Sequence, residues 1–269
     1  MYLKNCKKLI LITIITFSLS AKGSISPAKT PSIAANIECQ KIWDEGEKYQ
    51  LGLATEYGLC GIQRDKKKSL EFYKISAKRG NKLAQHKTGE MYFSGTTGKP
   101  DYVAAKKWFI KSAEQNYAPS QLRLGFLFAE GHFEGLKIDL KEAEKWFIKS
   151  AEQQIPDAQF RLGNFYRNYK KPPEKEKAIF WLEQAAKNNH RVAMFDLARM
   201  LKENNKNDDA IFWLKKAADL KLIPALLTLY ETYSAQKNEK LAKKYLEQAA
   251  KTGSLRAKMI LKKIKKDTK

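Results

Sequence analysis

Few side chains of this 269-residue sequence combine the type and spacing that catalysis or metal binding requires. Three histidines, His86, His132 and His190, are candidate bases or metal ligands, because a neutral imidazole can serve as either. None has a second ligand at metal spacing, and the H-E-x-x-H, G-x-S-x-G and C-x-x-C motifs are absent from the sequence. We therefore expect a protein that is not an enzyme, with no catalytic residues, metal, cofactor or small-molecule substrate.

Two further patterns raise the question of phosphate binding or acid–base chemistry. The stretch GTTGKP at 95–100 contains two glycines and a lysine, but it lacks the G-x-x-x-x-G-K-[ST] frame that cradles a phosphate. Glu142 and Glu144 form a carboxylate pair in a segment of helical periodicity, where such side chains normally lie on solvated faces. Neither pattern predicts a reactive site.

The first 22 residues have the pattern of an export signal. Three lysines lie within 2–8, an apolar run of eleven residues follows at 9–19, and small residues come next at Ser20, Ala21 and Gly23. The apolar run is shorter than the roughly 20 residues that span a bilayer. We expect a signal peptide at 1–22, with an uncleaved anchor as the alternative, and a periplasmic or secreted protein. The Ser- and Pro-containing stretch 23–36 is expected to be a flexible leader.

The formal net charge of +22 favours a polyanionic partner, and removal of residues 1–22 takes away four lysines and leaves +18. Only eight of the 51 basic residues are arginines, and the lysines are spread along the chain. Because export separates the protein from nucleic acid, we expect no nucleic-acid partner. Anionic envelope polymers or lipid surfaces remain the alternative partners.

Two cysteines, Cys39 and Cys60, would remain after export. If both lie on one continuous helix, their separation is about 30 Å, and a disulfide needs Cα atoms within about 7 Å. A bond between them would therefore require residues near 36–46 to fold back. The sequence leaves their redox state open.

The remainder of the chain is built from a repeated unit. Segments such as WFIKSAEQN (108–116), WFIKSAEQQ (146–154) and WLEQAAKNN (181–189) recur in register. Their second small residues are separated by 36, 38, 35, 32 and 32 residues and are Ala77, Ala113, Ala151, Ala186, Ala218 and Ala250. Self-similarity at this period is typical of stacked helical repeats.

A second motif alternates with the first and contains a glycine within a helical stretch, as in HKTGEMYFSG (86–95), LRLGFLFAEG (122–131) and FRLGNFYRN (160–168). A glycine inside a helix costs about 1 kcal/mol relative to alanine. Gly89, Gly125 and Gly163 therefore predict a close approach by a neighbouring helix. Each unit is expected to hold two amphipathic helices of about a dozen residues.

These residues resemble the unit of the Sel-1-like repeat family, a branch of the tetratricopeptide-like α/α repeats. The fourth unit carries the family pattern most directly, and a loop aspartate recurs as Asp65, Asp101 and Asp139. The resemblance implies an all-α, right-handed superhelical solenoid of about six helix-turn-helix repeats over 37–262, followed by a basic tail at 263–269. It also implies a bacterial scaffold or adaptor for another protein or peptide, in the envelope or in contact with host cells.

If the units pack as tetratricopeptides do, their first helices line the concave surface. Positions three before, one after and four after each glycine would then face a partner, and the basic side chains among them cluster around the fourth and fifth units. The expected groove residues are Tyr49, His86, Glu90, Leu122, Phe126, Phe160, Asn164, Arg167, Phe195 and Arg199. The alternative is that the "three before" positions only pack between helices. Charge-driven binding to an anionic surface, and an enzyme that acts on cell-wall material, are the competing functions.

Overall fold

The computed structural model describes residues 48–130 and 133–267, with side chains up to residue 264. The predicted signal peptide and leader, Cys6, Cys39 and His132 lie outside the described residues. Within these ranges there are thirteen α-helices, and none of them is long and apolar enough to span a bilayer. They are α3 (Lys48–Tyr57), α4 (Lys66–Lys78), α5 (Lys82–Ser94), α6 (Tyr102–Glu114), α7 (Ala118–Ala129), α8 (Leu140–Ala151), α9 (Pro156–Asn168), α10 (Lys175–Lys187), α11 (Arg191–Glu203), α12 (Asn207–Asp219), α13 (Ile223–Ala235), α14 (Glu239–Lys251) and α15 (Leu255–Asp267).

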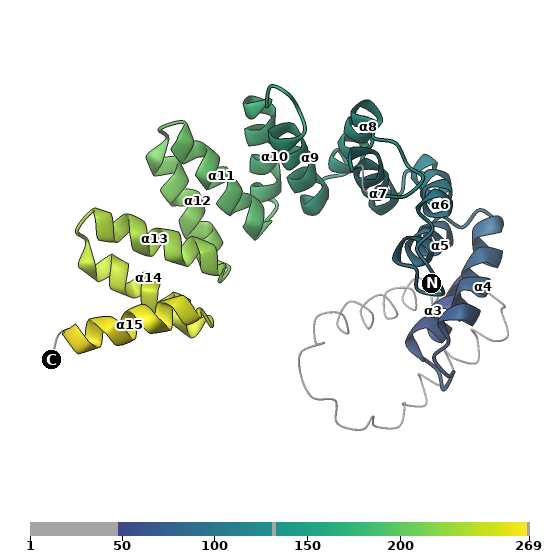
Figure 1. The fold of residues 1–269 in the computed structure, drawn as a ribbon, viewed down its shortest axis with the longest axis horizontal. Helices are drawn as coiled ribbons and strands as arrows, with labels where there is room; N and C mark the ends of the chain where they lie inside the picture. Colours follow the sequence, from purple (N-terminus) through teal and green to yellow (C-terminus); the bar gives the residue numbers. More distant parts are fainter. Residues whose placement is uncertain (1–47, 131–132, 268–269) are drawn as a thin grey trace, which may run out of the picture. The chain divides into compact units, whose positions relative to one another are not determined.

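Each helix packs on the next one in chain order, so that α3 to α14 form six helix pairs and α15 covers the last pair (Figure 1). The predicted all-α solenoid of about six helix-turn-helix repeats is confirmed. The helix α15 continues to Asp267, into the stretch 263–269 that we predicted as a basic tail. Ile260 and Leu261 of this helix pack against the hydrophobic core.

The loop aspartates start the second helix of each of the first three pairs. The carboxylate of Asp65 accepts a hydrogen bond from the backbone N–H of Lys68 at 3.0 Å, and Asp101 accepts one from Ala104 at 2.8 Å. Asp139 accepts from the backbone N–H groups of Lys141 and Glu142, both at 3.1 Å. This capping satisfies N–H groups that have no partner within the helix. The loop aspartate is therefore a helix cap in this chain.

The mid-helix glycines mark close contact between the two helices of a pair. A Cβ atom built on Gly89 would lie 2.6 Å from the ring of Phe109, and one on Gly163 would lie 2.9 Å from Leu182. Real side chains do not approach so closely, because atoms at these separations overlap. The close approach expected from the sequence is confirmed.

Buried glutamines tie the first four repeats to one another. Gln121 is 2% exposed, and its side-chain amide donates to the carbonyl of Ala113 in the preceding repeat at 3.2 Å. Its own oxygen accepts from Gln153 at 2.7 Å. Met194 and Leu226 occupy the equivalent positions in the last two repeats. At this position the repeats are therefore joined by polar contacts in the first part of the array and by apolar contacts in the last part.

The turn that follows each second helix contains one residue in the left-handed region of backbone space. These residues have φ between 58° and 110° and are Gly80, Asn116, Gln154, Asn189, Lys221 and Gly253. A side chain at such a φ costs energy that glycine avoids. Four of the six turns thus carry local strain, which the packing of the repeats must offset.

We predict that Lys221→Gly raises the free energy of unfolding by about 0.5 to 1 kcal/mol, because Lys221 has a φ of 58° and an exposed side chain. Lys243→Gly is the matched control, since Lys243 is exposed within α14 and should cost about 1 kcal/mol. Urea unfolding followed by circular dichroism measures both. A loss of stability in the Lys221 variant would contradict the assignment of strain to this turn.

Candidate functional site

The first helices of repeats 1 to 4 line a hollow of about 650 Å³, which we call the first-helix groove. Its walls come from α3, α5, α7 and α9, together with Thr96 in the loop after α5. The lining residues are Glu56, His86, Lys87, Glu90, Met91, Ser94, Thr96, Pro119, Leu122, Arg123, Phe126, Asp157 and Arg161. The groove thus runs across four repeats, as expected of a surface built by stacking helix pairs.

The charged groups of the groove pair with one another. Lys87 Nζ lies 3.1 Å from Glu56 Oε2, which joins α5 to α3. Arg123 donates to both carboxylate oxygens of Glu90, at 2.6 and 2.9 Å, which joins α7 to α5. Within α9, Arg161 lies 3.6 Å from Asp157. Three basic and three acidic side chains therefore give the groove no net charge, although the whole chain carries +22.

The ring of Phe126 forms part of the groove wall, and a guanidinium group lies over it. Phe126 packs edge-on against Phe147 of α8, with ring centroids 5.4 Å apart. The guanidinium of Arg161 lies 5.1 Å from the Phe126 ring and 5.6 Å from the Phe160 ring. The Arg161 side chain is 43% exposed, so it remains within reach of a partner. A partner could displace or stack on this group, as arginine does at many interfaces.

His86 lies at the base of the groove in a buried environment. Its Nδ1 lies 2.9 Å from Ser120 Oγ, and its ring contacts Phe109 and Tyr117 with centroid distances of 5.6 and 5.1 Å. Burial lowers the pKa of His86 to about 3, and the positive charges of Arg123 and Lys87 act in the same direction. The imidazole is therefore neutral at physiological pH.

A serine, a histidine and a glutamate stand in the order of a hydrolase triad, because Glu90 lies 3.9 Å from His86 Nε2 on the side opposite Ser120. Ser120, however, is fully buried between repeats. Its hydroxyl donates to Ser112 Oγ at 2.8 Å, and Ser112 donates to the carbonyl of Lys82 at 2.8 Å. His86 must then donate to Ser120 and cannot act as its base. The arrangement holds repeats 2 and 3 together and offers no nucleophile to a substrate.

A network of hydrogen bonds around a buried tyrosine fixes the side chains at the α3 end of the groove. Tyr73 of α4 is fully buried, and its hydroxyl donates to Glu56 Oε2 at 2.6 Å. Burial and the Glu56 carboxylate raise the pKa of Tyr73. Lys87 contacts the same carboxylate and also Tyr57 Oη at 3.0 Å. The Glu56 carboxylate of α3 is therefore held in place by residues of two other helices, α4 and α5.

Four of the ten residues expected to face a partner line the first-helix groove, namely His86, Glu90, Leu122 and Phe126. Tyr49 instead packs on Tyr73, with ring centroids 5.8 Å apart. The expectation of an accessible ring at Phe160 needs a correction, because this residue is only 9% exposed and stacks on His190 at 4.5 Å. At these two positions the alternative, packing between helices, describes the geometry.

The other four expected residues lie along the later helices, outside the groove. Arg167 and Arg199 both face Asp196 of α11, at 3.4 and 4.0 Å, so the basic cluster expected there is partly neutralised. Phe195 is half-buried against the core. The side-chain oxygen of Asn164 is buried and has no hydrogen-bond partner in the part of the chain that the structure describes.

Sequence reasoning missed three basic groove residues, Lys87, Arg123 and Arg161. Each stands two positions before a mid-helix glycine, in HKTG, LRLG and FRLG. That recurrence was a usable signal. Cys60 is disulfide-bonded, and the other two cysteines lie outside the described residues. No group of three or more metal-ligating side chains occurs within the described ranges.

The fold and the groove define an α/α repeat protein with a surface suited to binding. The Sel1 repeat model matches residues 48–81, 82–117, 118–154, 156–190, 192–222 and 229–254. These matches cover most of the chain, and the protein therefore belongs to the Sel1 repeat family. The matched segments coincide with the six helix pairs, although the last one begins within α13.

Among solved structures, the chain is similar to c5321, a protective antigen of uropathogenic Escherichia coli with an SLR fold. The two share 27% identity and a TM-score of 0.69, over 85% of this chain and 51% of c5321. A Sel1 repeat protein from Oxalobacter formigenes has the same fold, with 23% identity and a TM-score of 0.63, over 80% of this chain and 99% of that one.

A sel1-like repeat-containing protein of Acanthamoeba polyphaga mimivirus is 44% identical over 46 residues, which is 17% of this chain and 8% of the viral protein. The chain thus spans about half the length of c5321 and less than a tenth of the viral protein.

We predict that His86 makes the fold sensitive to acid. The unfolded imidazole takes up a proton below about pH 6.5, but the folded one does so only near pH 3. Between these two pH values the unfolded state therefore binds more protons than the folded state. As the pH is lowered through this range, the free energy of unfolding decreases by up to about 1.4 kcal/mol per pH unit. His86→Gln should flatten this dependence between about pH 6.5 and 4.5, measured by urea unfolding at each pH. Parallel curves for both proteins would rule out the buried neutral histidine.

Proposed function

We propose that this chain is a non-catalytic scaffold that binds another protein or a peptide in the first-helix groove. The observation that carries the proposal is the composition of the groove, in which Leu122 and Phe126 lie between charges that are already paired. Such a surface offers apolar contact without a net field. A folded or extended polypeptide matches it, because interface cores are apolar and depleted of unpaired charge.

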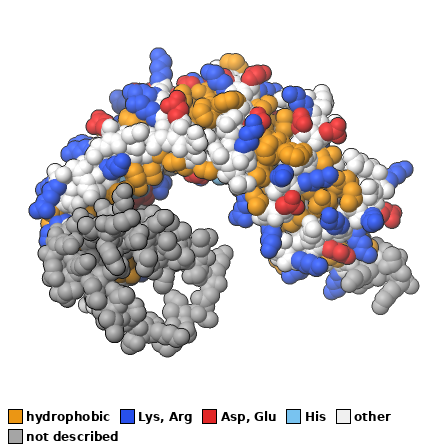
Figure 2. Space-filling model, turned by 180° about the vertical axis from the view of Figure 1, so that it is seen from behind, with side chains coloured by type: hydrophobic (Ala, Val, Ile, Leu, Met, Phe, Trp, Pro, Cys, Tyr) orange, Lys and Arg blue, Asp and Glu red, His pale blue; other side chains and the backbone are white. Residues whose placement is uncertain are grey.

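Membership of the Sel1 repeat family supports a protein partner, since stacked repeats present extended binding surfaces. The burial of Ser120 weighs against the minor alternative of an enzyme acting on cell-wall material. The charge distribution weighs against binding by charge alone, because basic side chains are scattered along the visible face of the array and gather in no single block (Figure 2).

We further propose that the protein is exported, to the bacterial periplasm or beyond the cell, and acts in the envelope or in contact with a host. The support is the signal-peptide pattern of residues 1–22. Similarity to c5321, which is a protective antigen, adds weight to a role in host contact.

The first test locates the partner on the surface. A photo-crosslinking residue at Arg161, in the groove, should capture a partner in cells, whereas the same residue at Lys107, exposed on α6, should not. Mass spectrometry identifies the captured protein. Equal capture at both positions would contradict a groove-specific interaction.

The second test uses the purified partner. We predict that Leu122→Lys weakens binding at least about tenfold, because it places a charge in the apolar part of the groove. Leu220→Lys is the matched control, since Leu220 is 40% exposed and lies outside the groove. Binding should persist at about 1 M salt, where surface charges are screened within about 3 Å. Loss of all binding at high salt would favour the charge-driven alternative.

A further inference from the structure

The helix α15 has one side packed on the array and another side that is exposed within the described chain. Its inner side is buried, with Ala257 fully covered and Ile260 and Leu261 packed against the core. On the other side, Leu255 is 74% exposed and Met259 is 72% exposed. These are the two most exposed large apolar side chains among the described residues. Exposed apolar side chains that lie together mark interaction sites, whereas single ones are common on protein surfaces, so this pair requires an explanation.

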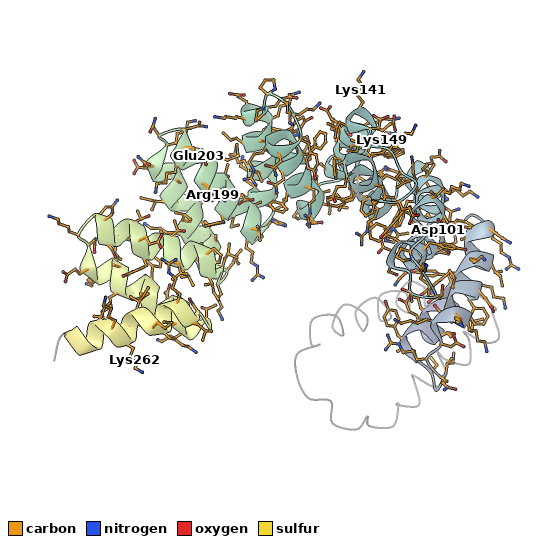
Figure 3. All side chains as sticks on the ribbon, in the orientation of Figure 1. Asp101, Lys141, Lys149, Arg199, Glu203 and Lys262 are labelled. Carbon is orange, nitrogen blue, oxygen red and sulfur yellow. The ribbon has the colours of Figure 1, made fainter. Side chains whose placement is uncertain are left out.

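Basic side chains surround the apolar pair. Residues 255–264 contain four basic side chains and no acidic one, and all four basic side chains are exposed. They are Arg256, Lys258, Lys262 and Lys263. Arg256 is paired with Glu231 of α13 at 2.9 Å, and Lys262 projects from the side of α15 that faces away from α14 (Figure 3). At helical spacing, Lys258 and Lys262 flank Leu255 and Met259 on the same face.

The positive charge of this face indicates which kind of partner could cover it. A second copy of the chain would place the same lysines opposite one another, in a protein of net charge +22. A bilayer surface with anionic lipids meets both features, because lysines contact the headgroups and apolar side chains enter the boundary with the acyl chains. We propose that α15 binds the surface of a membrane that contains anionic lipids, with Leu255 and Met259 inserted and Lys258, Lys262 and Lys263 on the headgroups.

This membrane-binding face is separate from the first-helix groove. The groove is lined by α3, α5, α7 and α9, and α15 lies at the other end of the chain order. A scaffold held on a membrane through α15 would leave the groove free for its partner. Each proposal can therefore fail without the other.

The test is sedimentation of the full chain with vesicles of phosphatidylcholine alone and of phosphatidylcholine mixed with phosphatidylglycerol. The double variant Leu255→Ser/Met259→Ser should bind the mixed vesicles at least about tenfold more weakly than the unaltered chain. Lys262→Gln and Lys263→Gln should each cost about fivefold. These differences should be absent with phosphatidylcholine alone. The unaltered chain and all variants contain the predicted export signal, so any vesicle binding by that segment is the same in each of them.

The matched control is Phe180→Ser/Phe212→Ser, which removes two side chains that are each 51% exposed, on α10 and α12. This control should bind the mixed vesicles as the unaltered chain does. An equal loss of vesicle binding in both double variants would overturn the proposal. A loss of binding in the lysine variants alone would also overturn it, because it would indicate adsorption to any polyanion. A dimer that the Leu255→Ser/Met259→Ser change dissociates would assign the face to a second copy. Met259→Ser alone keeps the comparison valid if the double variant unfolds.

Discussion

A contact without room for a side chain sets the geometry of the first repeats. Gly125 of α7 faces the ring of Phe147 in α8 so closely that a Cβ on the glycine would lie 2.5 Å from the ring. The same relation joins Gly52 to Tyr73. The glycine costs helix stability of about 1 kcal/mol, but the ring it admits is almost fully buried, which returns more. In the fifth repeat, Ala198 replaces the glycine and Leu214 replaces the aromatic ring. The larger residue on the first helix is thus accompanied by a smaller residue on the second helix.

The repeats are then joined in ways that leave a binding surface behind. Buried glutamines such as Gln121 connect one pair to the next on one side, and the charge pairs Lys87–Glu56 and Arg123–Glu90 connect successive first helices on the other. Because these charges neutralise one another, a strongly basic chain presents a groove of balanced charge. The same side chains thus join the repeats and set the charge of the groove that we propose as the binding surface.

Local patterns made the helix pairs predictable, because each depends on residues close in sequence. The recurrence of Ala113 and Ala151 predicted the repeated unit, and the mid-helix glycines predicted the close approach of a neighbouring helix. The loop aspartates were visible in the sequence, but their capping of the second helices came from the structure. The site was less accessible to such reasoning. Arg123 meets Glu90 across 33 residues, and the burial of Phe160 depends on a ring in the next repeat. The exposure of Met259 depends on which side of α15 packs on the preceding repeats, which follows from the folded structure.

The most direct test of this account is a double-mutant cycle on Gly125 and Phe147, measured as free energies of unfolding in urea. Gly125→Ala alone should cost about 1 to 3 kcal/mol, because its Cβ meets the ring. Adding Phe147→Leu recreates the pair of the fifth repeat and should recover at least about 1 kcal/mol of the summed single effects. Recovery of that size would establish the close contact as the constraint on helix pairing. Additive effects would contradict it.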